Sequence, residues 1–170
     1  MRTKHNQAVL LANRPWPFTS QDTLPLSWWR TLPSDKLRDA EKLLLHATLE
    51  RIEVLRGGAE LRAALRGDAA AAIAVTFLVT PIQDFTLEVD IVMTALLRCA
   101  ADGDCAAALV LANVLGRTEL GHAHATELSA SWFVQHVNRS PHRRAFSTEE
   151  AALLAALRER YAENGDEGRA

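Results

Sequence analysis

After residue 33 the apolar positions recur mostly at steps of three and four, which is the spacing of an amphipathic helix. Five of the predicted helices begin at a residue type that accepts hydrogen bonds from the free amide groups of a first turn. These N-caps are Ser34, Asp68, Thr86, Asp104 and Ser147, the last forming a Ser-x-x-Glu capping box with Glu150. The pattern predicts helices over residues 34–56, 59–66, 69–79, 86–101, 104–115, 118–137 and 147–162.

The first of these helices is apolar on more than one side. One stripe consists of Leu37, Ala40, Leu44 and Ala47, and it is widened by Leu45, Leu49 and Ile52. A helix with so wide an apolar face packs against neighbours on several sides. We therefore expect residues 34–56 to occupy a central place in the fold and to end at Gly57 and Gly58.

The composition also favours helices. Ala occurs 29 times and Leu 25 times among the 170 residues, and both are strong helix formers. Residues 69–79 alternate like a buried strand, but Asp68 and four leading alanines favour a helix there. We expect one all-α domain of six or seven helices, either a helical bundle or a short stack of helical hairpins. Its parts are an N-terminal arm (1–33), a helical domain (34–163) and a disordered tail (164–170).

One stretch nearly repeats itself. Residues 67–73, Gly-Asp-Ala-Ala-Ala-Ala-Ile, align with residues 103–109, Gly-Asp-Cys-Ala-Ala-Ala-Leu. Each copy is a capped short helix, a connector and a longer helix, and such a pair buries its apolar face by stacking on a neighbour. The period and the Gly-Asp-Ala start resemble a helical-hairpin repeat of the tetratricopeptide or Sel1 kind over residues 67–136. The Trp, Gly, Tyr and Pro markers of the tetratricopeptide repeat are absent, and a bundle without repeats is the alternative.

The N-terminal arm combines prolines with large aromatic residues. Four prolines between residues 15 and 33 exclude a long helix, although a short one is possible near residues 4–13. The aromatic residues are costly to expose, so they either pack on the helical body or dock on another chain. They are Trp16, Phe18, Trp28 and Trp29, and we take them as candidate partner-binding residues. Trp28 and Trp29 are adjacent, so we expect one to face the body and the other an interface.

Charge and hydropathy limit the partners and the compartment. The net charge is −2, whereas dedicated nucleic-acid-binding proteins carry a strong basic excess. No run of 18 uncharged apolar residues and no signal-peptide pattern occur, so we expect a cytoplasmic protein without a membrane partner. A local basic cluster is a weak candidate anion site, and it contains Arg139, His142, Arg143 and Arg144.

One segment carries several potential metal ligands. Glu119 and His122 are three residues apart and would share a face of the helix predicted over residues 118–137, with His124 close by. A Glu-x-x-His pair is one ingredient of di-iron and di-manganese helical bundles, but those sites need a second such pair. This sequence has only one, so we predict no cofactor and keep a metal site at these three residues as an alternative.

Two further motifs have weaker alternatives. Cys99 and Cys105 fit small buried side chains at facing helix ends, with a redox-active pair as the alternative. Residues 111–116 match the first helix and the turn of a helix-turn-helix motif, whose recognition helix would start near Glu119. In that motif His122 would face the core, and the negative charge of Glu119 would oppose phosphate.

No catalytic signature is present in the sequence: it has no Gly-x-Ser-x-Gly, no glycine-rich phosphate loop and no His-Glu-x-x-His. The prediction is therefore a non-catalytic interaction protein, an adaptor, a regulator or a small subunit of a larger assembly. It would bind another protein, or a second copy of itself, through the aromatic arm and grooves between helices. The alternatives are a metal-dependent helical enzyme and a DNA-binding regulator.

Overall fold

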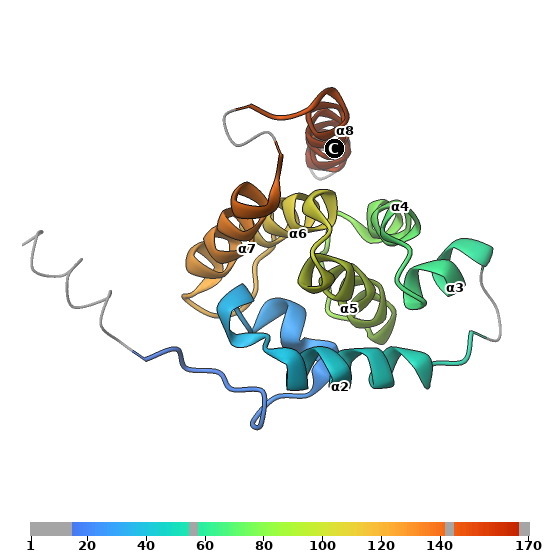
Figure 1. The fold of residues 1–170 in the computed structure, drawn as a ribbon. Coiled ribbons are helices and arrows are strands. Elements are labelled where there is room, and N and C mark those ends of the chain that lie inside the picture. Colours follow the sequence, from blue (N-terminus) through green and yellow to red (C-terminus); the bar gives the residue numbers. More distant parts are fainter. Residues whose placement is uncertain (1–14, 55–57, 142–144, 167–170) are drawn as a thin grey trace, which may run out of the picture.

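The computed structural model describes residues 15–54, 58–141 and 145–166. Two short 3-10 helices come first, η1 (Pro25–Arg30) and η2 (Ser34–Lys36). The α-helices that follow are α2 (Asp39–Glu50), α3 (Ala59–Leu65), α4 (Ala69–Val79), α5 (Leu87–Asp102), α6 (Cys105–Arg117), α7 (Ala125–Arg139) and α8 (Thr148–Asp166). No strand occurs among the described residues, and the predicted all-α fold is confirmed (Figure 1).

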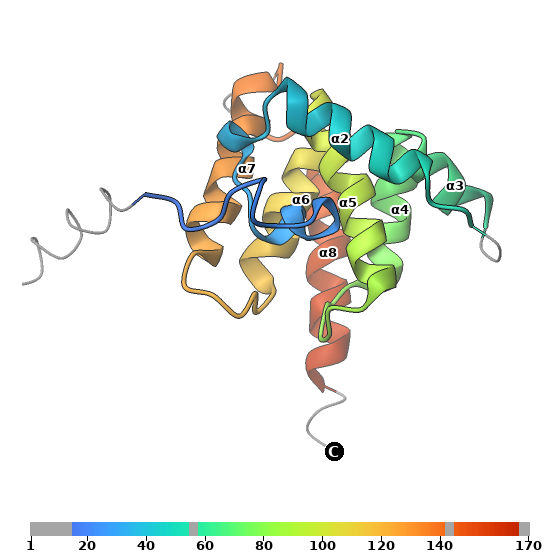
Figure 2. The same cartoon turned by 90° about the horizontal axis from the view of Figure 1, so that it is seen from below.

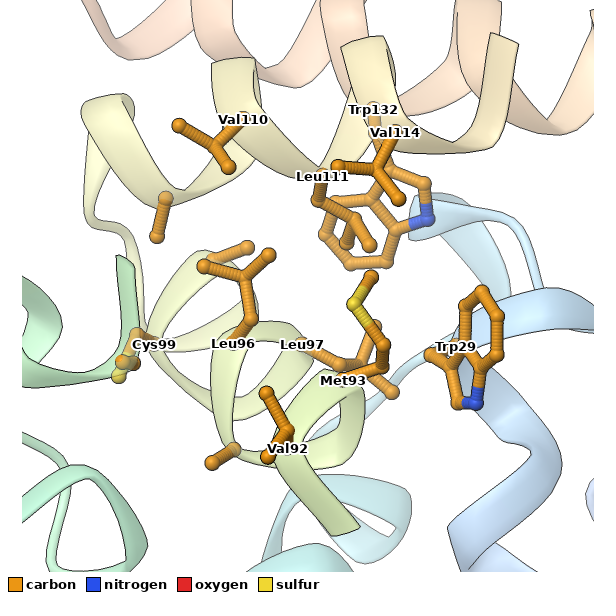
Figure 3. Packing of buried hydrophobic residues seen from close by; sticks show 14 of the residues in the cluster. Trp29, Val92, Met93, Leu96, Leu97, Cys99, Val110, Leu111, Val114 and Trp132 are labelled. Carbon is orange, nitrogen blue, oxygen red and sulfur yellow. The ribbon is translucent and has the colours of Figure 1, made fainter. Parts of the chain in front are cut away.

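The centre of the fold is α5, which packs against α2, α3, α4, α6 and η1. From Val92 to Ala101 every residue of this helix is buried. Its side chains meet those of α6, and Trp29 and Trp132 lie at the same end of the apolar cluster, opposite Cys99 (Figure 3). The polar side chains of this stretch are Thr94 and Arg98, and they can be buried because they donate to the carbonyls of Asp90 and Leu65.

The prediction for the first long helix was wrong in both extent and place. Helix α2 has 12 residues and lies on the outside of the molecule, with Leu45 and Leu49 buried beneath it (Figure 2). Its outer face leaves Leu43 69 % and Leu44 48 % exposed. Ser34 does not start the helix, because its hydroxyl donates to the Ser131 carbonyl at 3.1 Å. This bond to α7 holds the chain in a 3-10 turn, so helical winding begins only after it.

The caps predicted for four helices are confirmed. The side chains of Asp68, Thr86 and Asp104 each accept a hydrogen bond from the amide three residues later. The Ser147–Glu150 capping box has both of its hydrogen bonds. The Ser147 hydroxyl accepts from the Glu150 amide, and the Glu150 carboxylate accepts from the Ser147 amide. These helices therefore start where local chemistry satisfies their first amides.

The near-repeat exists in the structure as a repeated turn between helices. Gly67 and Gly103 have positive φ angles of 97° and 112°, which end α3 and α5. In both turns the Asp amide that follows donates back over the turn at 3.0 Å, and the Asp side chain then caps the next helix. An arginine guanidinium lies against each glycine, Arg98 at Gly67 and Arg139 at Gly103. The successive helices α3 to α7 each pack on the next one, as in a stack of hairpins.

The boundary between α6 and α7 also differs from the prediction. Gly116 does not stop α6, because it lies inside the helix where α7 crosses closely. A Cβ at this position would lie 3.1 Å from the Ser129 hydroxyl oxygen, which itself donates to the Ala112 carbonyl at 2.7 Å. Thr118 follows the end of α6 and does not begin a helix, and α7 begins only at Ala125.

The last helix, α8, lies across the top of the molecule in Figure 1. Leu157 is completely buried, Arg160 donates to the Thr80 carbonyl at 3.1 Å, and the Arg117 guanidinium lies over the Tyr161 ring. Helix α8 continues to Asp166, so residues 164–166 of the predicted tail are helical and residues 167–170 lie outside the described part. None of the described helices is both long and apolar enough to cross a bilayer.

Candidate functional site

The inner end of the arm is built into the core. Trp28 and Trp29 are both 0 % exposed, and their indole N–H groups donate to the Thr23 carbonyl at 3.1 Å and to Asp90 Oδ1 at 2.8 Å. Neither side chain presents any surface to a second chain. The structure therefore corrects the expectation that one of the two faces an interface, because η1 packs against both α5 and α2, and these cover side chains that point in different directions.

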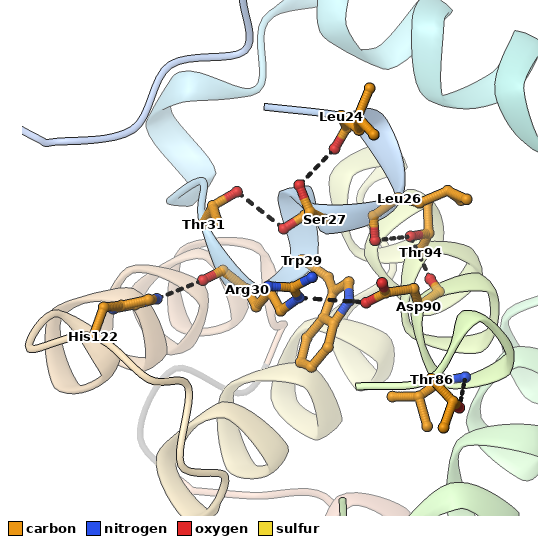
Figure 4. A network of polar contacts seen from close by, with 11 residues as sticks. Leu24, Leu26, Ser27, Trp29, Arg30, Thr31, Thr86, Asp90, Thr94 and His122 are labelled. Atoms are coloured by element: carbon orange, nitrogen blue, oxygen red, sulfur yellow. Dashed lines mark hydrogen bonds and ion pairs between the residues drawn. The ribbon is translucent and has the colours of Figure 1, made fainter. Parts of the chain in front are cut away.

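Asp90 on α5 is the main polar anchor of this region. Besides the Trp29 indole it meets the Arg30 guanidinium, whose Nε lies 3.4 Å from the same carboxylate oxygen (Figure 4). Next to it the Thr94 hydroxyl lies within 3.2 Å of the Leu26 carbonyl oxygen and 2.6 Å of the Asp90 carbonyl oxygen. A partly buried carboxylate that accepts two donors holds η1 against α5 by more than apolar contact.

The outer end of the arm meets the two histidines that were candidate metal ligands. Trp16 lies against the His124 ring at 5.1 Å between ring centroids, and Phe18 lies against the His122 ring at the same distance. The Trp16 indole also donates to the Thr31 carbonyl at 2.7 Å. We call Trp16, Phe18, His122 and His124 the aromatic–histidine cluster. All four side chains are half-buried.

The histidine geometry is that of a structural contact. His122 Nε2 lies 2.7 Å from the Arg30 carbonyl oxygen and Nδ1 accepts from the His124 amide at 3.2 Å, so both ring nitrogens have partners (Figure 4). Glu119 and His122 lie between α6 and α7, where Gly121 has a positive φ, so the predicted shared helix face is wrong. Among the described residues no three His, Cys, Asp or Glu side chains are grouped as metal ligands.

The helix-turn-helix hypothesis meets the same difficulty. Its recognition helix would have to begin near Glu119, but residues 118–124 form a connector and α7 begins at Ala125. The short turn of three or four residues that the motif needs is therefore replaced by a longer segment. His122, which the motif would place in the core, is instead paired with the arm.

Both cysteines and one residue of the basic cluster lie in the described part of the chain. Cys99 is buried, and burial, reinforced by the negative charge of Asp104, raises the pKa of its thiol to about 11. Cys105 is half-buried at the start of α6, and burial also raises its pKa. Arg139 lies over the Gly103 turn, and the other members of the candidate anion site, residues 142–144, lie outside the described part.

A buried His–Glu pair, which sequence reasoning missed, joins three helices. His136 Nδ1 on α7 lies 2.9 Å from the Cys105 carbonyl oxygen of α6 and 3.8 Å from Glu150 Oε1 of α8. Phe133 and Phe146 flank the His136 ring at about the same distance, 6.0 Å. The Ser147–Glu150 capping box was a usable signal for Glu150, but nothing in the sequence placed His136 beside it. The pair fastens the start of α8 to the body.

An apolar groove between α4, α6 and α8 was also not located by sequence reasoning. It encloses about 580 Å³. Its larger apolar lining residues are Ile73 of α4 and Leu153 of α8, and its acidic lining residues are Asp104 and Glu149. The remaining lining is entirely alanine: Ala69, Ala70, Ala106, Ala152 and Ala156. Small side chains on three adjacent helices leave an open channel at the point where larger ones would have filled it.

A second hollow lies on the other side of α4 and shares Ala70 with the groove. It measures about 410 Å³, and Glu60 and Asp68 are its charged residues among alanines. No basic side chain lines either hollow. The exposed surface around the N-terminal part of α4 is therefore apolar at its floor and acidic at its rim.

Comparison of the chain with protein-family models, with curated proteins and with solved structures gives no match.

Proposed function

We propose that this protein is a non-catalytic interaction protein that binds a protein segment in the groove between α4, α6 and α8. The observation that carries the proposal is the groove itself, an open and mainly apolar hollow of about 580 Å³ whose lining includes two carboxylates. Apolar surface of this kind, rimmed by polar groups, marks interaction sites on proteins. An inserted apolar side chain would lose its contact with water without any rearrangement of the three helices.

The structural roles of the potentially reactive side chains support the same proposal. His122 holds the arm through the Arg30 carbonyl, and His136 holds α8 through Glu150. Asp68 and Asp104 cap helices, and the Cys99 thiol is kept protonated by burial. These potential bases, ligands and nucleophiles are thus engaged in stabilising the fold, whereas Ala152 of the groove is exposed.

The test compares two variants of α8 that differ by one position. Ala152 lines the groove, and its neighbour Ala151 is equally exposed but does not. The full chain, expressed in its own host, is analysed by native mass spectrometry as wild type, Ala152→Trp and Ala151→Trp. We expect wild type and Ala151→Trp to carry the same bound protein mass, and Ala152→Trp to lose it with an unchanged melting temperature. A chain that is monomeric in all three samples, or an assembly that survives Ala152→Trp, would overturn the proposal.

A further inference from the structure

We propose that the occupant of the groove is the N-terminal segment, residues 1–14, of a second copy of this chain. The inference rests on the proposed function and names its partner. The proposal rests on the complementary chemistry of the groove and of the segment. It also rests on the position of Trp16, the aromatic residue closest to the segment in the sequence.

The groove requires an apolar and basic ligand. Its floor is made of Ile73, Leu153 and alanines, and carboxylates are present at Asp104 and Glu149. Glu60 and Asp68 add two more carboxylates on the other side of α4. Asp68 and Asp104 already accept helix amides, but Glu149 and Glu60 are exposed at the first turns of their helices. Arg98 and Arg139 lie at the turns before Asp68 and Asp104, so Glu149 and Glu60 are the carboxylates that remain available to a basic ligand.

The N-terminal segment has the matching composition. Residues 1–14 contain Arg2, Lys4 and Arg14 and no acidic residue. Between these charges lies an uninterrupted apolar run, Ala8 to Ala12, whose bulky members are Val9, Leu10 and Leu11. Leu and Val side chains suit a channel floored by alanine, because each small residue leaves room for a larger one from the partner. Basic residues at both ends of the run lie where they can approach the rim carboxylates.

The described end of the arm, to which the segment is joined, lies away from the chain's own groove. Trp16 is fixed on the body by its bond to the Thr31 carbonyl and by the His124 ring, so the segment starts at that point. In Figures 1 and 2 the arm and α8 lie on opposite sides of α5. A neighbouring copy therefore brings its groove to the segment more directly than the chain's own fold does. The contact joins two different surfaces, so it is head-to-tail and adds copies until a ring closes.

The experiment uses full-length chains that carry one defect each. Leu10→Asp disables the segment, and Asn6→Asp places the same charge at a polar position of the segment as a control. Ala152→Trp disables the groove, with Ala151→Trp as its control. Sedimentation velocity over a range of concentrations measures self-association. We expect wild type and both controls to associate, and each disabling change to raise the dissociation constant at least about tenfold. Added salt should weaken association, because the rim contacts are ionic.

Mixing the two defective chains gives the decisive result. The Leu10→Asp chain keeps an intact groove and the Ala152→Trp chain keeps an intact segment, so we expect them to form a complex that stops at one copy of each. If the segment occupied its own groove, the mixture would still pair but the wild type would stay monomeric. A symmetric contact between grooves would let the Leu10→Asp chain associate with itself and would give no mixed complex. Either result overturns the inference.

The outcome also separates this inference from the proposed function. If the host assembly is lost in Ala152→Trp but kept in Leu10→Asp, the groove binds another protein and only the identity of the occupant is wrong. If neither change affects the host assembly, the groove is not an interaction site and both proposals fail.

Discussion

The two ends of the N-terminal arm contain the same kinds of residue and are held in different ways. At the inner end, Trp28 and Trp29 have no exposed surface and belong to the core. At the outer end, Trp16 and Phe18 stay half-buried against two histidines of the connector between α6 and α7. The inner end is part of the fold, and the outer end belongs to the aromatic–histidine cluster on the surface.

The difference follows from what each end has to pack against. The inner end lies on α5, whose side chains form the centre of the core, and it gains a carboxylate partner at Asp90. The outer end lies on a connector, where the Trp16 indole has one hydrogen bond and ring contacts at 5 to 6.5 Å. Aromatic residues in one proline-rich stretch therefore contribute very unequally to stability, and mutations should show this.

The largest effect is expected for Trp29→Ala. Removing a fully buried indole leaves a cavity beside α5 and deprives Asp90 of a donor, which should lower the free energy of unfolding by about 3–5 kcal/mol. Urea unfolding followed by circular dichroism measures it. Trp29→Phe, which keeps most of the ring volume, should lose clearly less. Equal losses in the two variants would mean that the hydrogen bond and not the packing dominates.

Asp90→Ala should have the next largest effect. It leaves the buried Trp29 indole N–H without an acceptor and removes the ion pair of Arg30, at a cost of about 1–3 kcal/mol. Glu88→Ala is the matched control, since Glu88 is an exposed acid in the same first turn of α5. If both variants lose the same stability, the charge near the helix start matters and the anchor of the arm does not.

Mutations in the aromatic–histidine cluster should lower stability less. Trp16→Ala and His124→Ala should each lower stability by about 1 kcal/mol, because both rings are half-buried. The double variant should lose less than the sum of the two, since one ring contact is then counted twice. A strictly additive result would show that Trp16 and His124 do not hold each other in solution.

The smallest effect is expected for the labelling rate of Cys99 when the aromatic–histidine cluster loses Trp16. Burial raises the pKa of its thiol to about 11, so at mildly alkaline pH the reactive thiolate forms only after the core opens. Thiol labelling of Cys99, located by mass spectrometry, should therefore be unchanged in Trp16→Ala and much faster in Trp29→Ala. Faster labelling in Trp16→Ala would show that the aromatic–histidine cluster also protects the core from opening.

The sequence predicted the helices whose starts depend on local chemistry. Asp68, Thr86, Asp104 and the Ser147–Glu150 box cap helices as expected, because a cap needs only a side chain and an amide three residues away. The prediction failed at Ser34 and Thr118, which are good cap residues by type. Ser34 bonds to Ser131, 97 residues later, and Thr118 bonds back to the Val114 carbonyl at the end of α6.

The pattern of apolar residues likewise predicted only some of the buried positions. The wide apolar face of residues 34–56 indicated a central helix, but Leu44 of its first stripe faces outward whereas Leu45 and Leu49 are buried. The helix predicted over residues 104–115 ends before Gly116, whereas α6 continues through this glycine, whose lack of a side chain lets α7 cross closely. In both cases the residue type was informative, but the neighbour that gives it meaning lies elsewhere in the chain.

By itself, the sequence determined the all-α class, most helix starts, the repeated Gly-Asp turn and the need to shield the arm's tryptophans, because these depend on composition and on groups a few residues apart. Only the tertiary structure decided that α5 and not α2 is central, that His122 and His124 hold the arm, and that His136 meets Glu150. It also decided that alanines from α4, α6 and α8 line one groove. Such relations join residues tens of positions apart, and their distances are fixed only when the helices pack.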